Sequence, residues 1–579
     1  LAKGTPRLVF TPRLEAQLRD KLKSDPLVRA YYENCLRDTV QKMIKEPPTK
    51  FVLNGYRTPA GRLSISRLQA MAMVHRLEPA PAILQAIEAE LNAVCYFPNW
   101  NPQHFQDVAQ ISLGVAFALD WVGRDLRPET VKLAKAALIE KCLKPGYDES
   151  IDRMDWISGN NHWTPICHAG MVAAALTIAE DDPVLAAKTI ARAVDNMNRY
   201  LLEFHPHGTP PEGPGYWRYG NGFLALLSDM LTSALGSDFG IAADPGLIES
   251  AAVRLQLSAP SGEIFNFADS DGNTDGDTHL LLMWFAGKTG DGLFFNRAFF
   301  ENPNGGSGRL TGAALLWLAA QTPPEKTSDL PLAWYRNGTS PLAVFRGAKG
   351  DPAKFYLGIK GGSARTTHLH LDAGSFIFEL NGVRWSIDMG YQDNGALDKA
   401  GLNIYTFDQA SARWPLLSKN NFGHSTITAN GALFDVTGHA SITDFKDGAQ
   451  PEVTLDLTKP LGGMVGSLQR RFVKEVEQSI LIEDRFTTNE KTEYLTWQMM
   501  TVADVTLTTH GALLTQGGQK LSLEILSPQD LQVSVVALNP PPLPVDLPVK
   551  NLKRLEIRIP AYTVKGQSGL LQVRLSGRR

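Results

Sequence analysis

The stretch THLHLDAGSFIFELNGVRWSIDMG, residues 367–390, decides the fold of the second half of the chain. Apolar side chains recur in it with a period of two, which is the pattern of a β-strand. The pair Asn381-Gly382 interrupts the pattern and is typical of a tight turn between antiparallel strands. The stretch therefore predicts a β-hairpin. If its first residues are already extended, His368 and His370 project from one face of the strand, about 6.6–7 Å apart.

The same stretch predicts a metal site. Asp388 lies near the end of the second predicted strand, where the hairpin would bring it beside His370. His424, in NNFGHSTI, opens a further predicted strand and completes a set of two histidines and one carboxylate. This set suits zinc with water or another group as the fourth ligand. Two alternatives stay open: the histidines are hydrogen-bonded sheet residues, or Asp372 is the carboxylate of the set.

Outward from the hairpin, the period of two continues to the C-terminus. It begins after a Pro-rich polar segment, QTPPEKTSDLP at 321–331, which marks a domain boundary. Short strands with Gly, Asn and Asp turns between them predict a large antiparallel β-sandwich over residues 326–579. Apart from the hairpin, its predicted strands are PLAVFRG, KFYLGIKGG, SILIEDRF, RLEIRIP and LLQVRLSG.

Before that boundary, in residues 1–325, apolar residues recur at three- and four-residue spacing, which predicts helices. Short connections with Pro or Gly separate them, as in antiparallel helical hairpins. Many helices of similar length predict a toroid or superhelix of helix pairs, with an irregular helical domain as the alternative. A chain of 579 residues is too long for one core, so we predict an α+β multidomain protein. The expected helices lie at 66–76, 105–122, 128–142, 168–178, 183–203, 222–235, 248–257, 278–285 and 311–321.

The composition argues against some classes of partner. Lys and Arg number 57 against 60 Asp and Glu, a formal charge of −3, which does not suggest bulk nucleic-acid binding. A local basic groove for an acidic polymer remains compatible with this total. No apolar stretch reaches the roughly 20 residues that span a bilayer, so we expect neither a nucleic-acid nor a membrane partner.

The cysteines and the first residue bear on the cellular compartment. The four cysteines are scattered, and we expect neither a disulfide framework nor a cysteine metal site. The sequence starts at Leu1 instead of Met, from which we expect a removed export signal and a periplasmic or secreted protein.

Three polar motifs stand out in the helical half. In SGNNHWTPICHAG, 158–170, Asn161 and His162 precede an apolar helix, where they are either functional or only helix caps. In PPEGPGYWRYGNGF, 210–223, Tyr216 lies in a Gly-rich stretch whose glycines would let a large ligand approach the backbone. The acidic run ADSDGNTDGD, 268–277, lacks EF-hand spacing and is predicted to be a structural loop.

Together these motifs resemble the heparinase II/III-type polysaccharide lyases. HLHLDAGSF, WSIDMG and FGHSTI resemble the C-terminal sheet of that family, and NNHW, PEGPGYWRYG and PRLVFTPRL...RDKLKSDP resemble its helical half. The motifs occur in the order of the family and cover essentially the whole chain. The resemblance implies an incomplete (α/α) toroid followed by an antiparallel β-sandwich, which agrees with the change of period.

The resemblance also implies roles for particular residues. The implied catalytic residues are Tyr216, His368, His162, Asn161 and Tyr405, the last in GLNIYTF, where alginate-lyase relatives have a second tyrosine. The implied ligands of a mainly structural Zn²⁺ are His370, Asp388 and His424. The residues expected to contact the substrate, with packing as the alternative for the aromatic ones, are Trp100, Trp156, Glu212, Trp217 and Tyr219.

The implied reaction is β-elimination, which removes the proton on C5 of a uronate and expels the oxygen on C4. His368 fits the base, and Tyr216 fits the acid or both roles in turn. Asn161 and His162 would stabilise the charge that builds up on the uronate carboxylate. We expect Tyr216 and His368 to meet across one groove that holds the sugar. Two candidate bases would allow attack on either face of the ring, so that glucuronate and its C5 epimer are both accepted.

The expected partner is an acidic polysaccharide, and the oligomeric state stays open. We favour glycosaminoglycans such as heparan sulfate, hyaluronan or chondroitin, with alginate or oligoalginate as the alternative. Two other functions remain possible for such a fold. One is a toroid glycoside hydrolase with paired carboxylates such as Asp155 and Glu212. The other is a glycan-binding protein without activity.

Overall fold

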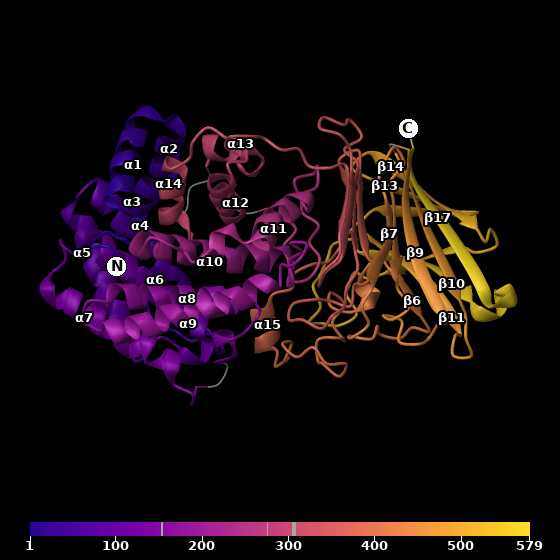
Figure 1. Ribbon diagram of the computed structural model, residues 1–579. Helices are drawn as coiled ribbons and strands as arrows, with labels where there is room; N and C mark the ends of the chain where they lie inside the picture. The colour runs from indigo at the N-terminus through magenta and orange to yellow at the C-terminus, as the bar shows by residue number, and fades with distance from the viewer. Residues whose placement is uncertain (152–153, 275, 304–307, 477, 579) are drawn as a thin grey trace. The chain divides into compact units, whose positions relative to one another are not determined.

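The computed structural model describes residues 1–151, 154–274, 276–303, 308–476 and 478–578. Helices make up the N-terminal part and antiparallel sheets the C-terminal part (Figure 1), so the predicted fold class is confirmed. By their contacts the residues form two compact units. Unit 1 consists of Leu1–Glu203, Trp217–Ala251 and Asp275–Asp329, and unit 2 of Phe204–Tyr216, Ala252–Thr274 and Leu330–Arg579. The predicted domain boundary between residues 325 and 326 stays a prediction.

The helices of the N-terminal part begin where the sequence offers a start signal. Proline occupies the first position of several of them, where its missing N–H costs no hydrogen bond. Thr11 and Asp182 cap two of these helices by accepting backbone N–H groups. In chain order the helices are α1 (Pro12–Ser24), α2 (Pro26–Tyr31), α3 (Asp38–Met43), α4 (Ala60–Leu77), α5 (Pro81–Cys95), α6 (Phe105–Val122), α7 (Pro128–Leu138), α8 (Trp163–Thr177), α9 (Pro183–Leu202), α10 (Gly213–Leu235), α11 (Pro245–Gln256), α12 (Gly276–Thr289), α13 (Arg297–Glu301) and α14 (Thr311–Ala319).

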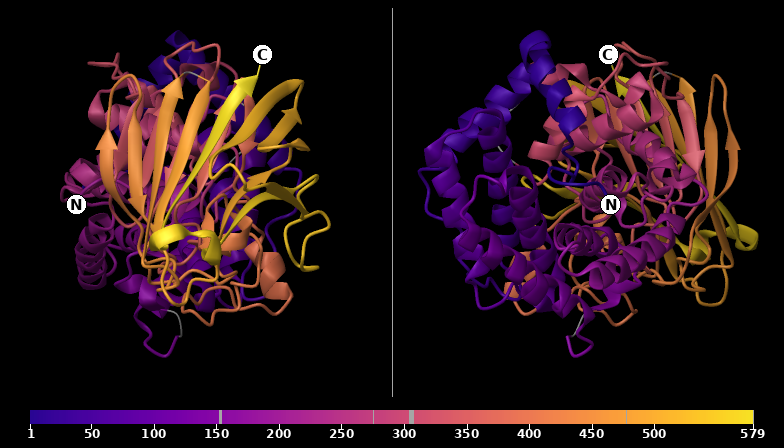
Figure 2. Two further views of the ribbon diagram at one scale, coloured as in Figure 1. Left: turned by 90° about the vertical axis from the view of Figure 1, so that its right-hand side faces the viewer. Right: turned by 60° about the vertical axis from the view of Figure 1, so that its left-hand side comes forward.

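Helix α6 lies at the centre of unit 1. Every residue from Phe105 to Val122 is buried, because α4 packs on one side of the helix and α8 on another. A helix that is buried all round needs no polar face, which explains its high apolar content. Farther along the chain, α14 returns to pack against α1, α4 and α12. The helices of this unit therefore follow a curved path that brings its last helix back to its first (Figure 2).

Helix α8 contains a buried histidine that predicts a pH-dependent stability. The His168 side chain is fully buried, its Nε2 lies 3.1 Å from the Ile157 carbonyl oxygen, and burial lowers its pKa to about 3. The unfolded ring titrates near 6.5, so this contribution to stability is fully present above about pH 6.5 and is lost as the pH falls toward 3. Glutamine at position 168 would keep an N–H donor for the Ile157 carbonyl oxygen but does not titrate. We therefore expect His168→Gln to reduce the fall in Tm between pH 7 and pH 5. An unchanged pH dependence of Tm would contradict this account.

Unit 2 contains three antiparallel sheets. A five-stranded sheet has the order β1-β2-β3-β4-β5, an eight-stranded sheet β12-β13-β14-β17-β10-β9-β8-β7, and a four-stranded sheet β15-β16-β11-β6. One apolar core joins residues of all three, such as Phe378, Ile482 and Trp497, as expected for sheets that pack face to face. The strands are β1 (Ala333–Arg336), β2 (Leu342–Arg346), β3 (Tyr356–Lys360), β4 (Phe376–Leu380), β5 (Val383–Ser386), β6 (Ile427–Ala429), β7 (Ser441–Lys446), β8 (Glu452–Asp456), β9 (Ser467–Val476), β10 (Ser479–Thr487), β11 (Tyr494–Thr501), β12 (Asp504–Thr508), β13 (Gly511–Gln516), β14 (Gln519–Ser527), β15 (Val533–Ala537), β16 (Lys553–Pro560) and β17 (Ser568–Arg578).

A segment from the helical half of the sequence belongs to unit 2. Phe265 and Phe267 form a second apolar cluster with Val344, Tyr356 and Ile377 of the five-stranded sheet. The segment 252–274 is therefore packed on that sheet, and the residues that follow Phe267 lie beside the turn that precedes β4.

The four cysteines are all buried thiols. Among the described residues, no helix combines the length and the apolar character that crossing a bilayer requires.

Candidate functional site

His368 lies in a turn and not in a strand. Strand β4 begins only at Phe376, and the backbone of His368 has a φ of +69°, in the left-handed region. The expectation that His368 and His370 share one face of a strand is therefore wrong. A non-glycine residue in this region costs energy and needs support from its surroundings.

His368 and Tyr216 are in direct contact. Their ring centroids are 3.7 Å apart with an angle of 22° between the planes, so that the rings stack. The pair meets as the sequence predicted, but not across a groove, because two stacked rings leave no room for a sugar between them. Because the rings stack, we expect a sugar to meet both polar groups on one side of the pair.

The start of α10 places Tyr216 beside His368. Gly213, with φ +84°, and Gly215 pack so closely on residues 267–270 that a Cβ at Gly213 would lie 2.7 Å from the Cβ of Ala268. A Cβ at Gly215 would lie 3.1 Å from the carbonyl oxygen of Asp269. The expectation that these glycines admit a ligand is wrong at both positions, since the protein backbone takes that space.

Asp269 connects the candidate residues of unit 2, and its role was missed in the sequence. Its Oδ2 lies 2.9 Å from Nδ1 of His368. Its Oδ1 lies 3.1 Å from Nε2 of His370 and also contacts the Lys419 ammonium. Burial would raise the pKa of Asp269, but the charge of Lys419 and the bonds from both histidines hold it well below its usual range. Asp269 is therefore an ionised, buried carboxylate. The acidic run around it, of which Asp275 lies outside the described residues, is a structural element as predicted and also part of the candidate site.

Asn394, at the start of helix α15 (Asn394–Lys399), was also missed. Its buried side-chain amide lies 3.4 Å from both the Tyr216 hydroxyl and Oδ2 of Asp269. These are long hydrogen bonds. The amide nevertheless joins Tyr216 to the carboxylate that binds His368.

The predicted metal ligands come together. One ligand atom from each of His370, Asp388 and His424 lies within 4.8 Å of the others, and all three residues are buried. His424 bonds Oδ2 of Asp388 through Nδ1 at 3.0 Å. Among the described residues, Nδ1 of His370 and Nε2 of His424 have no hydrogen-bond partner although they are buried. Two such nitrogens beside a carboxylate are what a metal ion requires, so this trio can hold a metal.

The pKa of His370 and the position of Asp372 support this trio. Burial and the charge of Lys419 lower the pKa of His370 to about 3, so its ring is neutral, as a ligand must be. The rival carboxylate, Asp372, instead forms a fully buried ion pair with Lys360 at 2.5 Å. Asp388 is therefore the carboxylate that the structure places with the two histidines.

The remaining candidates of unit 2 are Glu212 and Tyr405. Glu212 is buried, accepts a hydrogen bond of 2.8 Å from the Thr367 hydroxyl, and has an oxygen within 4.8 Å of a ring nitrogen of His368. The Tyr405 hydroxyl donates to Asp398 at 2.9 Å, and its ring packs against the buried Leu397, Ile404 and Leu416. The proposed catalytic role of Tyr405 stays a prediction.

Asn161 and His162 precede α8 in unit 1. Oδ1 of Asn161 accepts the Trp163 backbone N–H at 2.9 Å, which is a local bond at the start of the helix. His162 is buried, and its ring centroid lies 5.7 Å from that of Tyr219. The local bond agrees with the capping alternative for Asn161 and leaves a further role of either residue untested.

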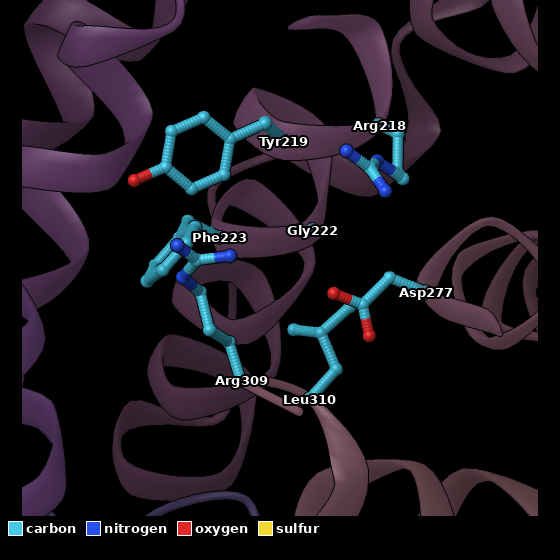
Figure 3. A pocket seen from close by; sticks show the side chains of 7 residues that line it. All are labelled: Arg218, Tyr219, Gly222, Phe223, Asp277, Arg309 and Leu310. Carbon is cyan, nitrogen blue, oxygen red and sulfur yellow. The ribbon is translucent and has the colours of Figure 1, made fainter. Parts of the chain in front are cut away.

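Tyr219 lines a small hollow of unit 1 (Figure 3). The Arg309 guanidinium lies 4.8 Å from the centre of its ring, and its hydroxyl donates to Gln106 at 3.2 Å. Arg218 and Asp277 line the same hollow. The lining therefore combines two arginines and one carboxylate with aromatic and aliphatic side chains.

The tryptophans proposed to bind sugar lie in the core. Trp100 is 0% exposed and donates its N–H to Val94, and Trp156 is 1% exposed and stacks on Phe105. Trp217 is 2% exposed and donates its N–H to the Ser250 hydroxyl. An enclosed ring offers no face to a sugar, so these residues take the packing role that the sequence left open.

Comparison with known proteins supports the family resemblance. Residues 341–537 match the family described as Heparinase II/III-like, C-terminal. Among solved structures, one titled heparinase III has a TM-score of 0.61 at 12% identity and covers 89% of this chain and 76% of its own. A heparan sulfate lyase from Pedobacter heparinus has a TM-score of 0.60 at 14% identity, with coverages of 97% and 88%. No match was found among curated proteins.

These comparisons confirm the predicted family resemblance. At identities this low the structural likeness shows the fold alone, and the family match covers the C-terminal sheets from β2 to β15. Residues 341–537 therefore resemble the C-terminal part of that family, and the fold of the chain resembles that of the two solved structures.

Proposed function

We propose that this protein, whose residues 341–537 match the family described as Heparinase II/III-like, C-terminal, cleaves uronate-containing polysaccharides by β-elimination. The observation that carries the proposal is the stacked pair of Tyr216 and His368, with His368 bonded to the buried carboxylate of Asp269. A phenol and an imidazole side by side provide both a proton acceptor and a proton donor.

The chemistry assigns one role to each group of the pair. With Nδ1 of His368 bonded to Asp269, we assign to Nε2 the role of taking the C5 proton. The Tyr216 hydroxyl gives a proton to the C4 oxygen as that bond breaks. The electron pair from the C5–H bond forms a double bond between C4 and C5, and no water is consumed. Asn161 and His162 remain our candidates for the groups that face the uronate carboxylate.

A glycosaminoglycan is the substrate that we propose, with alginate as the second choice. The structures that this chain resembles are titled heparinase III and heparan sulfate lyase, which favours that class. Such polymers are outside the cytoplasm, and we propose that the protein acts in the periplasm or after secretion.

An ultraviolet assay on a panel of purified polysaccharides tests the proposed function. The panel contains heparan sulfate, hyaluronan, chondroitin, alginate and an uncharged glucan as control. The conjugated double bond of a lyase product absorbs in the ultraviolet, whereas a hydrolase product does not. We expect absorbance to rise with at least one uronate polymer and not with the glucan. New reducing ends without absorbance would instead favour a glycoside hydrolase, and binding without new ends a glycan-binding protein.

The stacked pair also predicts a preference between uronate epimers. In glucuronate the C5 hydrogen and the C4 oxygen lie on the same face of the ring, whereas in its C5 epimer they lie on opposite faces. Because Tyr216 and His368 reach a sugar from one side, we now expect glucuronate to be cleaved about 10²-fold faster than the epimer. This replaces the expectation that both epimers are accepted. Oligosaccharides containing a single epimer test it, and equal kcat/KM values would contradict it.

We propose that the metal held by His370, Asp388 and His424 is zinc and that its role is mainly structural. When bound, the ion would link three separate segments of unit 2. Its removal by a chelator is expected to lower Tm by about 5–10 °C, and activity with it. Metal analysis and melting curves of the same preparation check this.

A matched pair of variants sharpens the metal test. His424→Ala should lose the ion, whereas His439→Ala, which changes a half-buried histidine of the same unit outside the trio, should retain it. A metal-free preparation with full activity and an unchanged Tm would contradict the proposal that zinc stabilises this protein.

A further inference from the structure

We propose that Asp269 is a positioning residue that fixes the tautomer and the orientation of His368, so that Nε2 is the ring nitrogen without a hydrogen. The inference rests on the proposed function and adds a residue to its machinery. It is carried by the contacts of Asp269 within unit 2.

Asp269 holds His368 at two points. Its Oδ2 lies 2.9 Å from Nδ1 of His368, and its backbone N–H donates to the His368 carbonyl oxygen at 3.1 Å. An ionised carboxylate only accepts hydrogen bonds, so Nδ1 carries a hydrogen, and in the neutral form of the ring, which is the form that acts as a base, Nε2 carries none. The backbone is strained in both turns that this backbone hydrogen bond joins, with φ +62° at Ala268 and +69° at His368. Strain of this kind persists only where the surroundings fix the geometry.

The other carboxylate oxygen of Asp269 is already engaged. Oδ1 contacts the Lys419 ammonium and lies 3.1 Å from Nε2 of His370. Lys419 and Asp269 are both buried, and each compensates the charge of the other. Because Oδ1 is held there, Oδ2 points to His368 and cannot rotate away without breaking this pair.

Asp269 also connects the candidate catalytic pair to the metal ligands. A carboxylate that accepts from the second nitrogen of a metal-binding histidine orients that ligand, and Asp269 has this relation to His370. In the same segment, Asn266 donates to the backbone carbonyl of Asp388 at 3.2 Å. The segment 266–269 therefore aligns His368 and the metal trio together.

Asp269→Asn tests the proposal. The amide of asparagine would donate to Nδ1 and favour the tautomer with the hydrogen on Nε2, which removes the base. We expect kcat on the best polymer of the panel to fall about 10²–10⁴-fold, with KM changed less than about threefold. Asp269→Glu should recover part of kcat, because it keeps a carboxylate.

Two further variants separate positioning from folding. Asp269→Asn leaves the Lys419 charge buried without compensation, so the double variant Asp269→Asn/Lys419→Met removes that charge as well. We expect it to recover Tm but not kcat. Asp484→Asn breaks another fully buried ion pair of unit 2, with Arg470. It should lower Tm and leave the kcat of the folded protein close to that of the wild type.

A direct readout of the tautomer does not depend on activity. NMR of isotope-labelled histidine, with the His368 signals assigned by their loss in His368→Asn, should show hydrogen on Nδ1 in the wild type and on Nε2 in Asp269→Asn. The opposite tautomer in the wild type, or a folded Asp269→Asn protein with wild-type kcat, would overturn the proposal. A wild-type protein that cleaves no uronate polymer would contradict the proposed function instead. The NMR result would still decide whether Asp269 fixes the tautomer of His368.

Discussion

Tyr216→Phe is expected to lower kcat for uronate polymers by about 10²–10⁴-fold, which is the usual contribution of a well-placed proton-transfer group. The phenylalanine ring keeps the stacking on His368 at 3.7 Å and loses only the hydroxyl that Asn394 approaches. The C4 oxygen would then leave without a proton. Initial rates from the ultraviolet assay, together with a melting curve of each protein, measure the effect.

A second tyrosine of unit 2 supplies the control for this variant. Tyr494 is half-buried in β11, and the guanidinium of Arg558 lies 3.6 Å from the centre of its ring. Tyr494→Phe removes the same atom from a tyrosine outside the candidate site and should keep kcat within about twofold, as expected for a surface change. Equal activities of Tyr216→Phe and Tyr494→Phe would exclude Tyr216 as a proton donor.

The second large effect is expected for His368→Asn. Asparagine tolerates the left-handed backbone of residue 368, and its amide can still donate to Asp269, so the turn should remain folded. It has no group that takes a proton near neutral pH. We therefore expect kcat to fall about 10²–10⁴-fold with little change in Tm.

The control for this variant is His439→Asn, at a half-buried histidine of unit 2 whose ring approaches Ser441 and Gly338. Its activity should match that of the wild type. If His368→Asn is folded and as active as His439→Asn, the base is not His368.

The parts of the fold with strong periodicity were predictable from the sequence. The apolar spacing of residues 105–122 gave a helix with the bounds of α6, and the turn pair Asn381-Gly382 does connect β4 to β5. Helix α5 was missed although a proline begins it. The periodicity of apolar residues predicts a helix or a strand well where the residues of that element alone determine its conformation.

The candidate site was predictable only in part, because its decisive contacts join residues far apart in the sequence. The metal trio followed from the predicted hairpin and from the family resemblance, but the alternation in HLHLD concealed the turn at His368, which only its φ of +69° reveals. Asp269 lies 99 residues before His368 and looked like part of a loop. The preceding run FNF, 265–267, has two apolar residues separated by one polar residue inside the helical half. An alternation over three residues is too short to predict that this segment packs on the sheet.

Burial of the tryptophans could not be read from the sequence either. An aromatic residue at the surface of a sugar site and one in a core have the same local pattern. Only the tertiary structure encloses Trp100 and Trp156.

The most direct test of cleavage by β-elimination is to ask whether oxygen from water enters the products. The protein is incubated with the polymer that it degrades in water carrying a heavy oxygen isotope, and the products are analysed by mass spectrometry. Elimination breaks the bond between C4 and its oxygen without water, so we predict products that contain no heavy oxygen and carry a C4–C5 double bond at the new non-reducing end. One heavy oxygen for each bond cleaved, with saturated ends, would show hydrolysis and contradict the account.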